Sequence, residues 1–494
     1  MDYREPDAYF IIESSVPECT GRRIRRLRSV LPVLLLLFLQ LSASVCDAQQ
    51  SADRIYVRRI EFRGVTRTND EVLRRELRQL EGTFLNPAAL EESRIYLERL
   101  PSVERAAVAI APVPDSENVV DVIVTITEEP TRRYGVGGGY ASSLGASANG
   151  YFDNDNLFGS GQQVSIAMDV SELGSIAEAS HTNPFAFDAG VSRTIGLVSR
   201  HIDKLTTDTS SVDAELVEGR LEYGYALTPQ QSVRLGLALR STALDAGPDT
   251  SAQLTSWIAA NGEPVVTNGA PSTEFTELDL TFRWRGDTSN HLSFPDEGLE
   301  QSLDVRAALP ASEVEYFTLR YDATRYWTVG SQWTASVHGL TAFGDSLGDT
   351  TALPPYLNWF AGGPSTVRGY RGLGPKDSLG NPYGGNLLVA GQLELKTAWP
   401  RRWASWMRSG FFLDAGNAYS TDDTAFFDAG GGVVDHGFDA SELRASAGIA
   451  ADLLLPFGTV RLSYAVPLNP SDGNGDATLR DREERFQVSF GVEF

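Results

Sequence analysis

The feature that most constrains the fold is an alternation of apolar and polar residues that recurs along most of the chain. A period of two places one residue type on each face of a β-strand. The alternation is visible in the segments 443–455 and 460–468 and is clearest in the last ten residues. There the apolar set comprises Phe486, Val488, Phe490, Val492 and Phe494. The pattern therefore predicts one-sided strands up to the final aromatic residue.

The beginning of the chain has the pattern of a secretory signal peptide. A basic stretch, 21–29, precedes an apolar core, LPVLLLLFLQL at 31–41, and small residues follow up to Ala48. That core is shorter than the roughly 18 to 20 residues that a membrane-spanning helix needs. Val45 before Cys46 disfavours the alternative of a lipoprotein site. We therefore expect a leader over 1–48, and both cysteines, Cys19 and Cys46, fall within it.

An exported chain with alternating segments fits a transmembrane β-barrel, although a soluble β-sandwich would show alternation too. The segments number about sixteen between 132 and 494, are about ten residues long and are joined by alternately short and long polar loops. An even number of strands is what a closed single-chain barrel requires, and a barrel of this size encloses an aqueous lumen. The sequence therefore predicts a barrel over 131–494.

Charge and motifs exclude several classes of function. The chain has 42 Lys and Arg against 65 Asp and Glu, a net charge of -23, whereas nucleic-acid binding needs a basic face. It has no G-x-S-x-G, P-loop or H-E-x-x-H motif, and its five histidines show no ligand spacing. We therefore expect no nucleic-acid partner, no enzyme activity, no metal and no cofactor.

Residues 54–130 form a separate pattern of strand, helix, helix, strand and strand. The segment 54–65 is typical of a strand, and Thr68 with Glu71 fits a capping box that opens a helix through Leu80. Asn86 and Pro87 favour the start of a second helix, and two strands are expected near 103–111 and 118–128. This order predicts a small α+β domain.

Several motifs in order resemble the family of BamA-type outer-membrane protein assembly factors. In that family a polypeptide-transport-associated (POTRA) domain precedes a sixteen-stranded barrel, which is the fold expected here: mainly β, with one β-α-α-β-β domain. The most specific motif is VRGY, at 367–370. The others include VLRRELRQLEG (72–82), NPAALEESRIYLERL (86–100), DNDNLFGSG (153–161), FFLDAGNAY (411–419) and the terminal FQVSFGVEF. Members of the BamA type have five POTRA domains, whereas this sequence has room for one.

The resemblance implies that the sixth extracellular loop folds back into the lumen. The glycine-rich stretch GGPSTVRGYRGLGP (362–375) would hold the VRGY residues Val367, Arg368, Gly369 and Tyr370. Glu394 and Asp414 are the implied acidic partners of Arg368. An arginine in a partly dehydrated lumen needs such carboxylates, because its planar fork binds them at two points.

Glycines predict a weak closure between the first and last barrel strands. Gly137, Gly138 and Gly139 succeed one another in the first strand, and Gly491 lies near Phe494 in the last. Glycine adds backbone entropy and no cross-strand packing. We therefore expect a lateral gate at these strands, unless the glycines only relieve crowding or allow a bend.

The resemblance also implies partners and a mechanism. Unfolded outer-membrane β-barrel proteins would be the clients, membrane lipid and lipopolysaccharide would surround the barrel, and accessory outer-membrane lipoproteins would contact Arg74 and Glu81. Clients would pair with the POTRA strand 103–111 or with the gate strands by strand addition. The alternatives are a secretion pore of the two-partner type and a passive porin.

Overall fold

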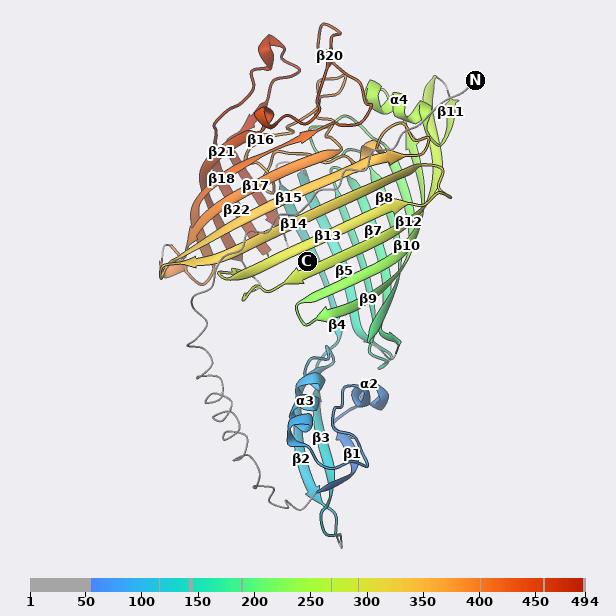
Figure 1. Cartoon of the computed structure of the whole chain (residues 1–494), viewed down its shortest axis with the longest axis vertical. Coiled ribbons are helices and arrows are strands. Elements are labelled where there is room, and N and C mark those ends of the chain that lie inside the picture. Colours follow the sequence, from blue (N-terminus) through green and yellow to red (C-terminus); the bar gives the residue numbers. More distant parts are fainter. Residues whose placement is uncertain are drawn as a thin grey trace, which may run out of the picture.

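The structure, a computed structural model, describes residues 55–114, 116–141, 145–187, 190–267, 269–291, 293–399, 401–455 and 458–491. The leader expected over 1–48 and the gate residue Phe494 lie outside these ranges. Figure 1 shows a barrel with a small domain at one end, here called the domain end. No helix of the described residues has the length and apolar character needed to cross a membrane.

The small domain is a three-stranded sheet with two helices. Its sheet order is β1-β3-β2, with β1 parallel and β2 antiparallel to the central β3. A cluster of buried aliphatic side chains, including Val57, Leu73, Leu97 and Val122, fills the space between sheet and helices. The elements are β1 (Tyr56–Arg63), α2 (Asp70–Arg75), α3 (Pro87–Leu97), β2 (Val103–Pro112) and β3 (Val119–Glu128).

The two helices start differently from one another. Asn86 caps α3 as expected, because its side chain accepts hydrogen bonds from the N–H groups of Ala88 and Ala89. The predicted capping box at Thr68 is wrong: α2 begins after Asn69 and ends at Arg75, well before Leu80. Thr68 is instead held by Glu128, to which its N–H donates, at the junction described below.

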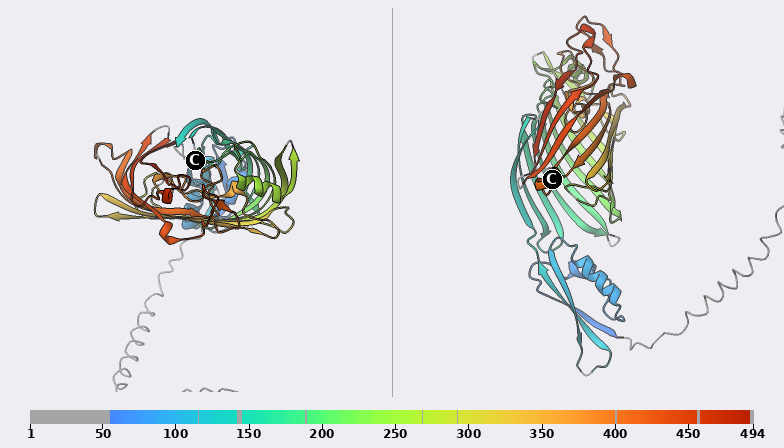
Figure 2. Two further views of the ribbon diagram at one scale, coloured as in Figure 1. Left: turned by 90° about the horizontal axis from the view of Figure 1, so that it is seen from above. Right: turned by 90° about the vertical axis from the view of Figure 1, so that its left-hand side faces the viewer.

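Sixteen strands close the barrel, as the alternation predicts, and a short strand, β11 (Glu263–Thr267), extends one hairpin beside them. Seen along the barrel, connecting segments cross the outline of the ring of strands (Figure 2). The strands are β4 (Arg132–Ala141), β5 (Gly145–Leu157), β6 (Gln162–Ser171), β7 (Gly174–Phe187), β8 (Val191–Ile202), β9 (Ala214–Thr228), β10 (Gln231–Asp245), β12 (Ala270–Asp287), β13 (Gly298–Ala308), β14 (Glu315–Val329), β15 (Trp333–Leu347), β17 (Leu387–Thr397), β18 (Met407–Tyr419), β21 (Arg444–Leu455), β22 (Gly458–Pro467) and β24 (Phe486–Gly491).

A short helix and several short strands lie in the loops at the end of the barrel opposite the domain. A helix, α4 (Ala252–Ala260), lies in the β10–β12 connection, and two strands, β19 (Phe426–Phe427) and β20 (Val433–Val434), pair in the β18–β21 connection. Two further short strands, β16 (Gly369–Arg371) and β23 (Arg482–Glu484), pair with each other although they belong to different loops.

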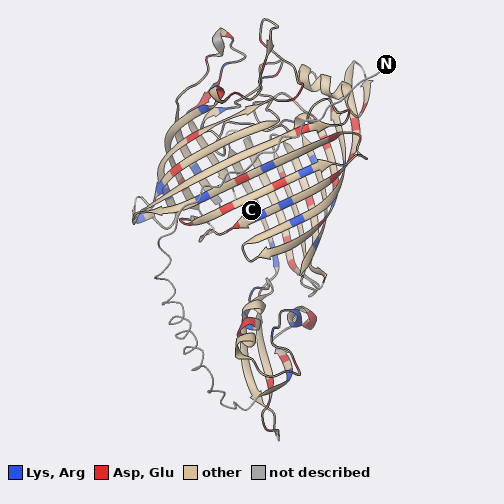
Figure 3. Cartoon of the chain, viewed as in Figure 1, with Lys and Arg blue, Asp and Glu red and all other residues tan. Residues whose placement is uncertain are grey.

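The strand alternation separates an apolar outer face from a charged lumen. On β10, Leu235, Leu237 and Leu239 are exposed, whereas Arg240 on the inner face is buried with Glu277 of β12 at 3.5 Å. Figure 3 shows charged residues recurring along the barrel strands. The lumen therefore contains paired charges, as expected for a barrel whose outer wall faces hydrocarbon.

Candidate functional site

The connection between β15 and β17, residues 348–386, enters the lumen and is called loop six here. Its inner turn contributes Val367, Tyr370 and Leu373 to an apolar cluster with the wall residues Leu340 and Leu388. All three loop side chains are fully buried. Loop six is thus packed against the wall as a core element would be, and it occupies the lumen.

Arg368 is bound at three points to Asp414 of β18. Its Nε and Nη2 donate to the two carboxylate oxygens, both at 2.7 Å, and its backbone N–H donates to Oδ2 at 3.0 Å. The Nη1 atom donates to Glu394 of β17 at 2.5 Å. The guanidinium also lies over the ring of Phe412, 3.6 Å from its centroid. The structure therefore brings together the three charged residues that the sequence analysis selected for loop six.

The carboxylates around Arg368 belong to a longer row of ion pairs. Glu394 Oε2 lies 2.5 Å from Lys396, Lys396 lies 2.6 Å from Asp452, and Asp452 lies 2.9 Å from Arg461. The row crosses the inner wall from β17 to β22, the strand next to the last one. Sequence reasoning missed Phe412, Lys396, Asp452 and Arg461, although strand parity places Lys396 on the same face as Glu394.

The position of Gly369 explains why the loop requires a glycine there. Its φ is +89°, in the left-handed region that only glycine enters freely. A Cβ atom at this position would lie 2.8 Å from Cβ of Ala465 on β22. Gly369 therefore lets the backbone pass the wall while Arg368 and Tyr370 point to different partners.

The first and last strands pair over a short stretch. Among the described residues, β24 and β4 pair at Ser489 with Ala141 and at Phe490 with Tyr140. On its other side β24 pairs with β22 at six positions, and β4 pairs with β5 at ten. We call the β24–β4 contact the seam. The described ranges end at Ala141 on β4 and at Gly491 on β24, so these two pairs are the described part of the seam.

The glycines expected at the seam lie on the two strands in question. Gly137, Gly138 and Gly139 are in β4, where each is paired with a residue of β5, and Gly491 is paired with Thr459 of β22. The described seam pairs do not include these glycines. One further step in the same register would place Gly139 opposite Gly491. Beside them Val136 is 92 % exposed, so this part of β4 presents an uncovered face.

The two edges of the domain sheet differ in how far they are occupied. The outer edge of β1 is occupied, because the N–H of Val57 donates to Thr83 and the N–H of Gly82 donates back to Val57. The N–H of Ile60 donates to Oε1 of Glu81 at 2.6 Å. The other edge strand, β2, pairs only with β3 among the described residues, and the N–H of Ala106 on its outer edge donates to Oε1 of Glu98 at 3.1 Å.

The residues proposed from the sequence as a lipoprotein contact, Arg74 and Glu81, lie next to each other. Nη1 of Arg74 donates to Oε1 of Glu81 at 3.1 Å, and both side chains are about two-fifths exposed. The hydrogen bond from Ile60, followed by the contact with Arg74, lowers the pKa of Glu81 below its ordinary value. Glu81 therefore also covers the edge of β1.

The small domain is attached to the barrel through the segment that precedes α2. The side chain of Asn156, near the end of β5, donates to the hydroxyl of Thr68, and the N–H of Asn69 donates to the carbonyl of Gly159 in the β5–β6 turn. A Cβ atom at Gly159, whose φ is +79°, would lie 2.1 Å from the carbonyl oxygen of Arg67. The motif DNDNLFGSG thus forms the turn that receives the domain.

Glu128, the last residue of β3, holds this segment. Its carboxylate accepts hydrogen bonds from the N–H groups of Thr66, Arg67 and Thr68 and from the hydroxyl of Thr66. Burial alone would raise the pKa of Glu128, but these hydrogen bonds outweigh it and lower the pKa to about 2.

Acid should therefore loosen the small domain through Glu128. A carboxyl whose pKa is lowered by folding contributes stability above its ordinary pKa near 4.5 and loses it as the pH falls toward 2. We expect the thermal midpoint of residues 54–130 to fall between about pH 5 and pH 3, and Glu128→Gln to show a smaller fall. Equal falls in both proteins, measured by circular dichroism, would contradict this assignment.

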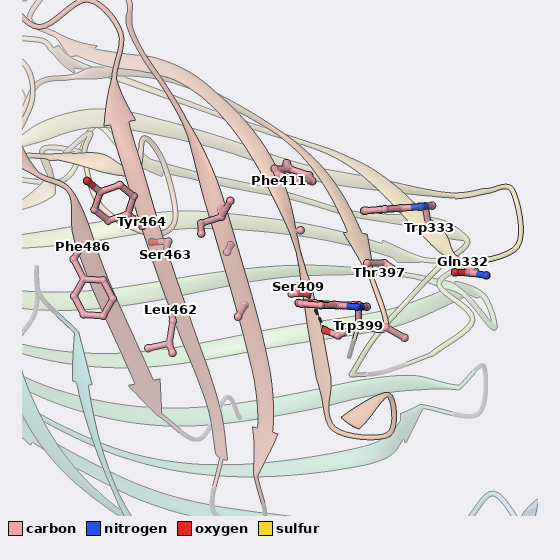
Figure 4. Close-up of a pocket in the computed structure, with 15 residues that line it drawn as sticks. Gln332, Trp333, Thr397, Trp399, Ser409, Phe411, Leu462, Ser463, Tyr464 and Phe486 are labelled. Carbon is pink, nitrogen blue, oxygen red and sulfur yellow. Dashed lines mark hydrogen bonds between the residues drawn. The ribbon is translucent and has the colours of Figure 1, made fainter. Parts of the chain in front are cut away.

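A groove of about 600 Å³ opens on the outer wall near the domain end (Figure 4). Large aromatic side chains surround it, and Phe486 of the last strand borders it. Small residues form its middle, namely Thr397, Ser409 and Ala451. The groove therefore lies on the apolar face and has no connection with the charges around Arg368.

A closed sixteen-stranded barrel with an occupied lumen and one β-α-α-β-β domain defines the class of POTRA-bearing β-barrel proteins. The profile of the Omp85 superfamily domain matches residues 156–494, and the POTRA profile described as "Surface antigen variable number repeat" matches 55–129. The chain belongs to the Omp85 superfamily. The resemblance to its BamA-type members is confirmed by the relatives described next.

Two relatives share the name "Outer membrane protein assembly factor BamA". The protein of Neisseria meningitidis serogroup B is 27% identical over 464 residues, covering 89% of this chain and 57% of the relative. That of Neorickettsia risticii is 22% identical, covering 86% and 54%. The chain thus spans a little over half the length of these curated relatives.

The fold has solved counterparts. The crystal structure of BamA from Haemophilus ducreyi lacking POTRA domains 1–3 is 26% identical, with a TM-score of 0.77, covering 89% of this chain and 85% of that one. CdiB from Acinetobacter baumannii is 11% identical with a TM-score of 0.51, which shows a shared fold alone.

Proposed function

We propose that the protein is an outer-membrane protein assembly factor that folds and inserts β-barrel clients. In this proposal residues 1–48 are a signal leader, 54–130 a periplasmic POTRA domain and 131–494 an outer-membrane barrel. The single observation that carries it is the seam, where the glycine-rich strand β4 meets β24 and closes the ring. Three successive glycines add no cross-strand packing, so this closure is suited to open sideways, and the relatives named for assembly share this barrel.

The mechanism is strand addition at two edges. An unfolded client in the periplasm pairs with β2, whose outer edge makes fewer hydrogen bonds of its own than the edge of β1. Main-chain hydrogen bonds give affinity without demanding a particular sequence, which suits many different clients. The client then pairs with β4 at the opened seam and leaves sideways into membrane lipid and lipopolysaccharide. No step requires a catalytic side chain or a cofactor.

The occupied lumen favours assembly over a passive pore. Loop six packs Val367, Tyr370 and Leu373 against the wall and fixes Arg368 by ion pairs, so part of the lumen is occupied by the barrel's own chain. A porin needs an open lumen. A secretion pore of the two-partner type remains the second candidate, and the low identity to CdiB supports only the fold.

The test measures insertion and conductance with the same preparation. Purified protein in proteoliposomes should convert a radiolabelled unfolded barrel client into a protease-resistant, folded form, and single channels should show only small, intermittent conductance. Large steady conductance without client insertion would support a porin and contradict the proposal. Passage of a client into the vesicle lumen, without its insertion, would support the secretion pore.

An accessory lipoprotein contact at Arg74 and Glu81 is part of the proposal. We expect Arg74→Glu to reduce co-purification of envelope lipoproteins, because it places a like charge beside Glu81. Glu81→Gln is the matched variant, since an amide oxygen can still accept from Ile60 and the edge of β1 stays covered. Undiminished lipoprotein recovery with Arg74→Glu would remove this contact from the proposal.

A further inference from the structure

Loop six is bonded to the last barrel strand through one side chain, Gln487 of β24. Its Nε2 donates to the carbonyl of Tyr370 at 3.1 Å, and its Oε1 accepts from the N–H of Gly369 at 3.4 Å. The side chain is 1 % exposed. An amide side chain offers a donor and an acceptor at once, so glutamine meets both backbone groups together.

A second contact joins the same residues of loop six to the segment leading into β24. The short strand β16 pairs with β23, with Gly369 opposite Glu484, Tyr370 opposite Glu483 and Arg371 opposite Arg482. One residue, Arg485, separates β23 from β24. The backbone of loop six thus follows the entry of the last strand, and Gln487 continues this contact inside the barrel.

The neighbouring residue of the loop is fixed on a different part of the wall. Arg368 is held by Asp414 of β18 and Glu394 of β17, whereas Gly369 and Tyr370 are held by β24. Between β18 and β24 the wall contains β21 and β22. Three consecutive residues therefore connect the last strand to a distant, fully paired part of the barrel.

We propose that Gln487 is a positioning residue that fastens the last strand to loop six and so holds the seam closed. The inference rests on the proposed function for the meaning of the seam as an exit. The described part of the seam comprises two residue pairs, and a bond from the lumen side adds to its closure. Opening of the seam then requires that the hydrogen bonds between β24 and loop six break, or that the ion pairs between Arg368 and its carboxylate partners break.

Hydrogen exchange of the purified full-length protein in lipid nanodiscs tests this inference. Amide exchange reports how often a hydrogen-bonded segment opens. With Gln487→Ala we expect deuterium uptake in peptides covering 486–491 and 132–141 to become about tenfold faster, the size expected when a hydrogen bond is lost. Uptake in β12 and β13, on a distant part of the wall, should stay unchanged.

Three further variants separate positioning from general destabilisation. Gln487→Glu keeps an acceptor for Gly369 but cannot donate to Tyr370, so it should also open the seam. Ser489→Ala, two residues along the same strand, should leave uptake as in the parent. An oxidised cysteine pair from Tyr140→Cys and Phe490→Cys, in the Gln487→Ala background, should return seam uptake to the slow rate. Unchanged seam uptake in Gln487→Ala, or an equal rise all round the barrel, would overturn the inference.

The test stays decisive if the glutamine variants fail to assemble, which gel migration with and without boiling would reveal. Glu483→Pro, in an exposed segment, then interrupts the β16–β23 pairing from the outside and should raise seam uptake in the same peptides. Parent-like uptake in that variant would overturn the inference. Hydrogen exchange is measured without a client. If the variants raise deuterium uptake at the seam but the parent protein inserts no client, the proposed function is contradicted and the inference about Gln487 is not.

Discussion

A disulfide between cysteines replacing Tyr140 and Phe490 should abolish client insertion, and its reduction should restore it. The two residues are directly opposite each other across the seam, so a disulfide can join them with little backbone movement. The proposed mechanism needs β4 and β24 to separate before a client strand can pair. Closing that gap covalently removes the step on which all insertion depends, and the effect should be complete.

The chain allows a clean version of this experiment. Both native cysteines, Cys19 and Cys46, lie in the expected leader, so a processed chain would contain only the introduced pair. A matched control joins Ile449 to Tyr464, which are opposite each other on β21 and β22 and also exposed outside the barrel. That lock should leave insertion intact. Normal insertion by a fully oxidised seam lock in a folded barrel would contradict the lateral gate.

Arg368→Ala should weaken the protein far more than Arg371→Ala. Removing Arg368 leaves Asp414, which is fully buried, without its charged partner, and breaking such a pair costs on the order of 3 kcal/mol. Arg371 also binds a carboxylate, Asp208, at 2.7 Å, but this pair is partly exposed and is worth about 1 kcal/mol or less. The contrast between the arginines is therefore one of burial, since both have partners.

The measurement is the temperature at which the folded gel band is lost, together with client insertion by each variant. Arg368→Lys should behave nearly as badly as Arg368→Ala, because an ammonium cannot bind both oxygens of Asp414 and lie flat over Phe412. Arg368→Ala combined with Asp414→Ala should recover part of the loss, since no buried charge then remains unpaired. Equal behaviour of the Arg368 and Arg371 variants would remove loop six from the mechanism.

The barrel was predictable from sequence because its main signal is local. A strand with one face toward hydrocarbon and one toward a polar lumen must alternate apolar and polar residues. On β10, for example, the outward residues Leu235, Leu237 and Leu239 alternate with inward ones, whichever strands lie beside it. The order of the small domain was readable for the same reason. Its first helix was mispredicted because Thr68 serves the junction with the barrel, a tertiary demand that local spacing cannot reveal.

Contacts of loop six were only partly accessible to sequence reasoning. VRGY, Glu394 and Asp414 came from the family resemblance, since nothing in their spacing brings residues 368, 394 and 414 together. Gln487 was on the correct face by parity, but its partners are backbone groups more than a hundred positions away. Every residue type has a backbone carbonyl and nearly every type a backbone N–H, so the sequence does not indicate which residues provide backbone partners. The row through Lys396, Asp452 and Arg461 was missed because charged lumen residues are too common for any one to stand out.

The contacts of Gln487 also bear on how this barrel comes to be built. Loop six connects β15 and β17, yet it bonds to a residue 118 positions later in the chain, on the strand that closes the ring. Contacts between such distant residues form late, because the entropy of closing the intervening loop must be met first. Loop six can bind its partners on β17 and β18 once those strands are in place, but its bonds to β23 and Gln487 must wait until β21 and β22 have been added. These last contacts of the loop therefore form together with the closure of the ring, and a chain stalled before β24 would lack them.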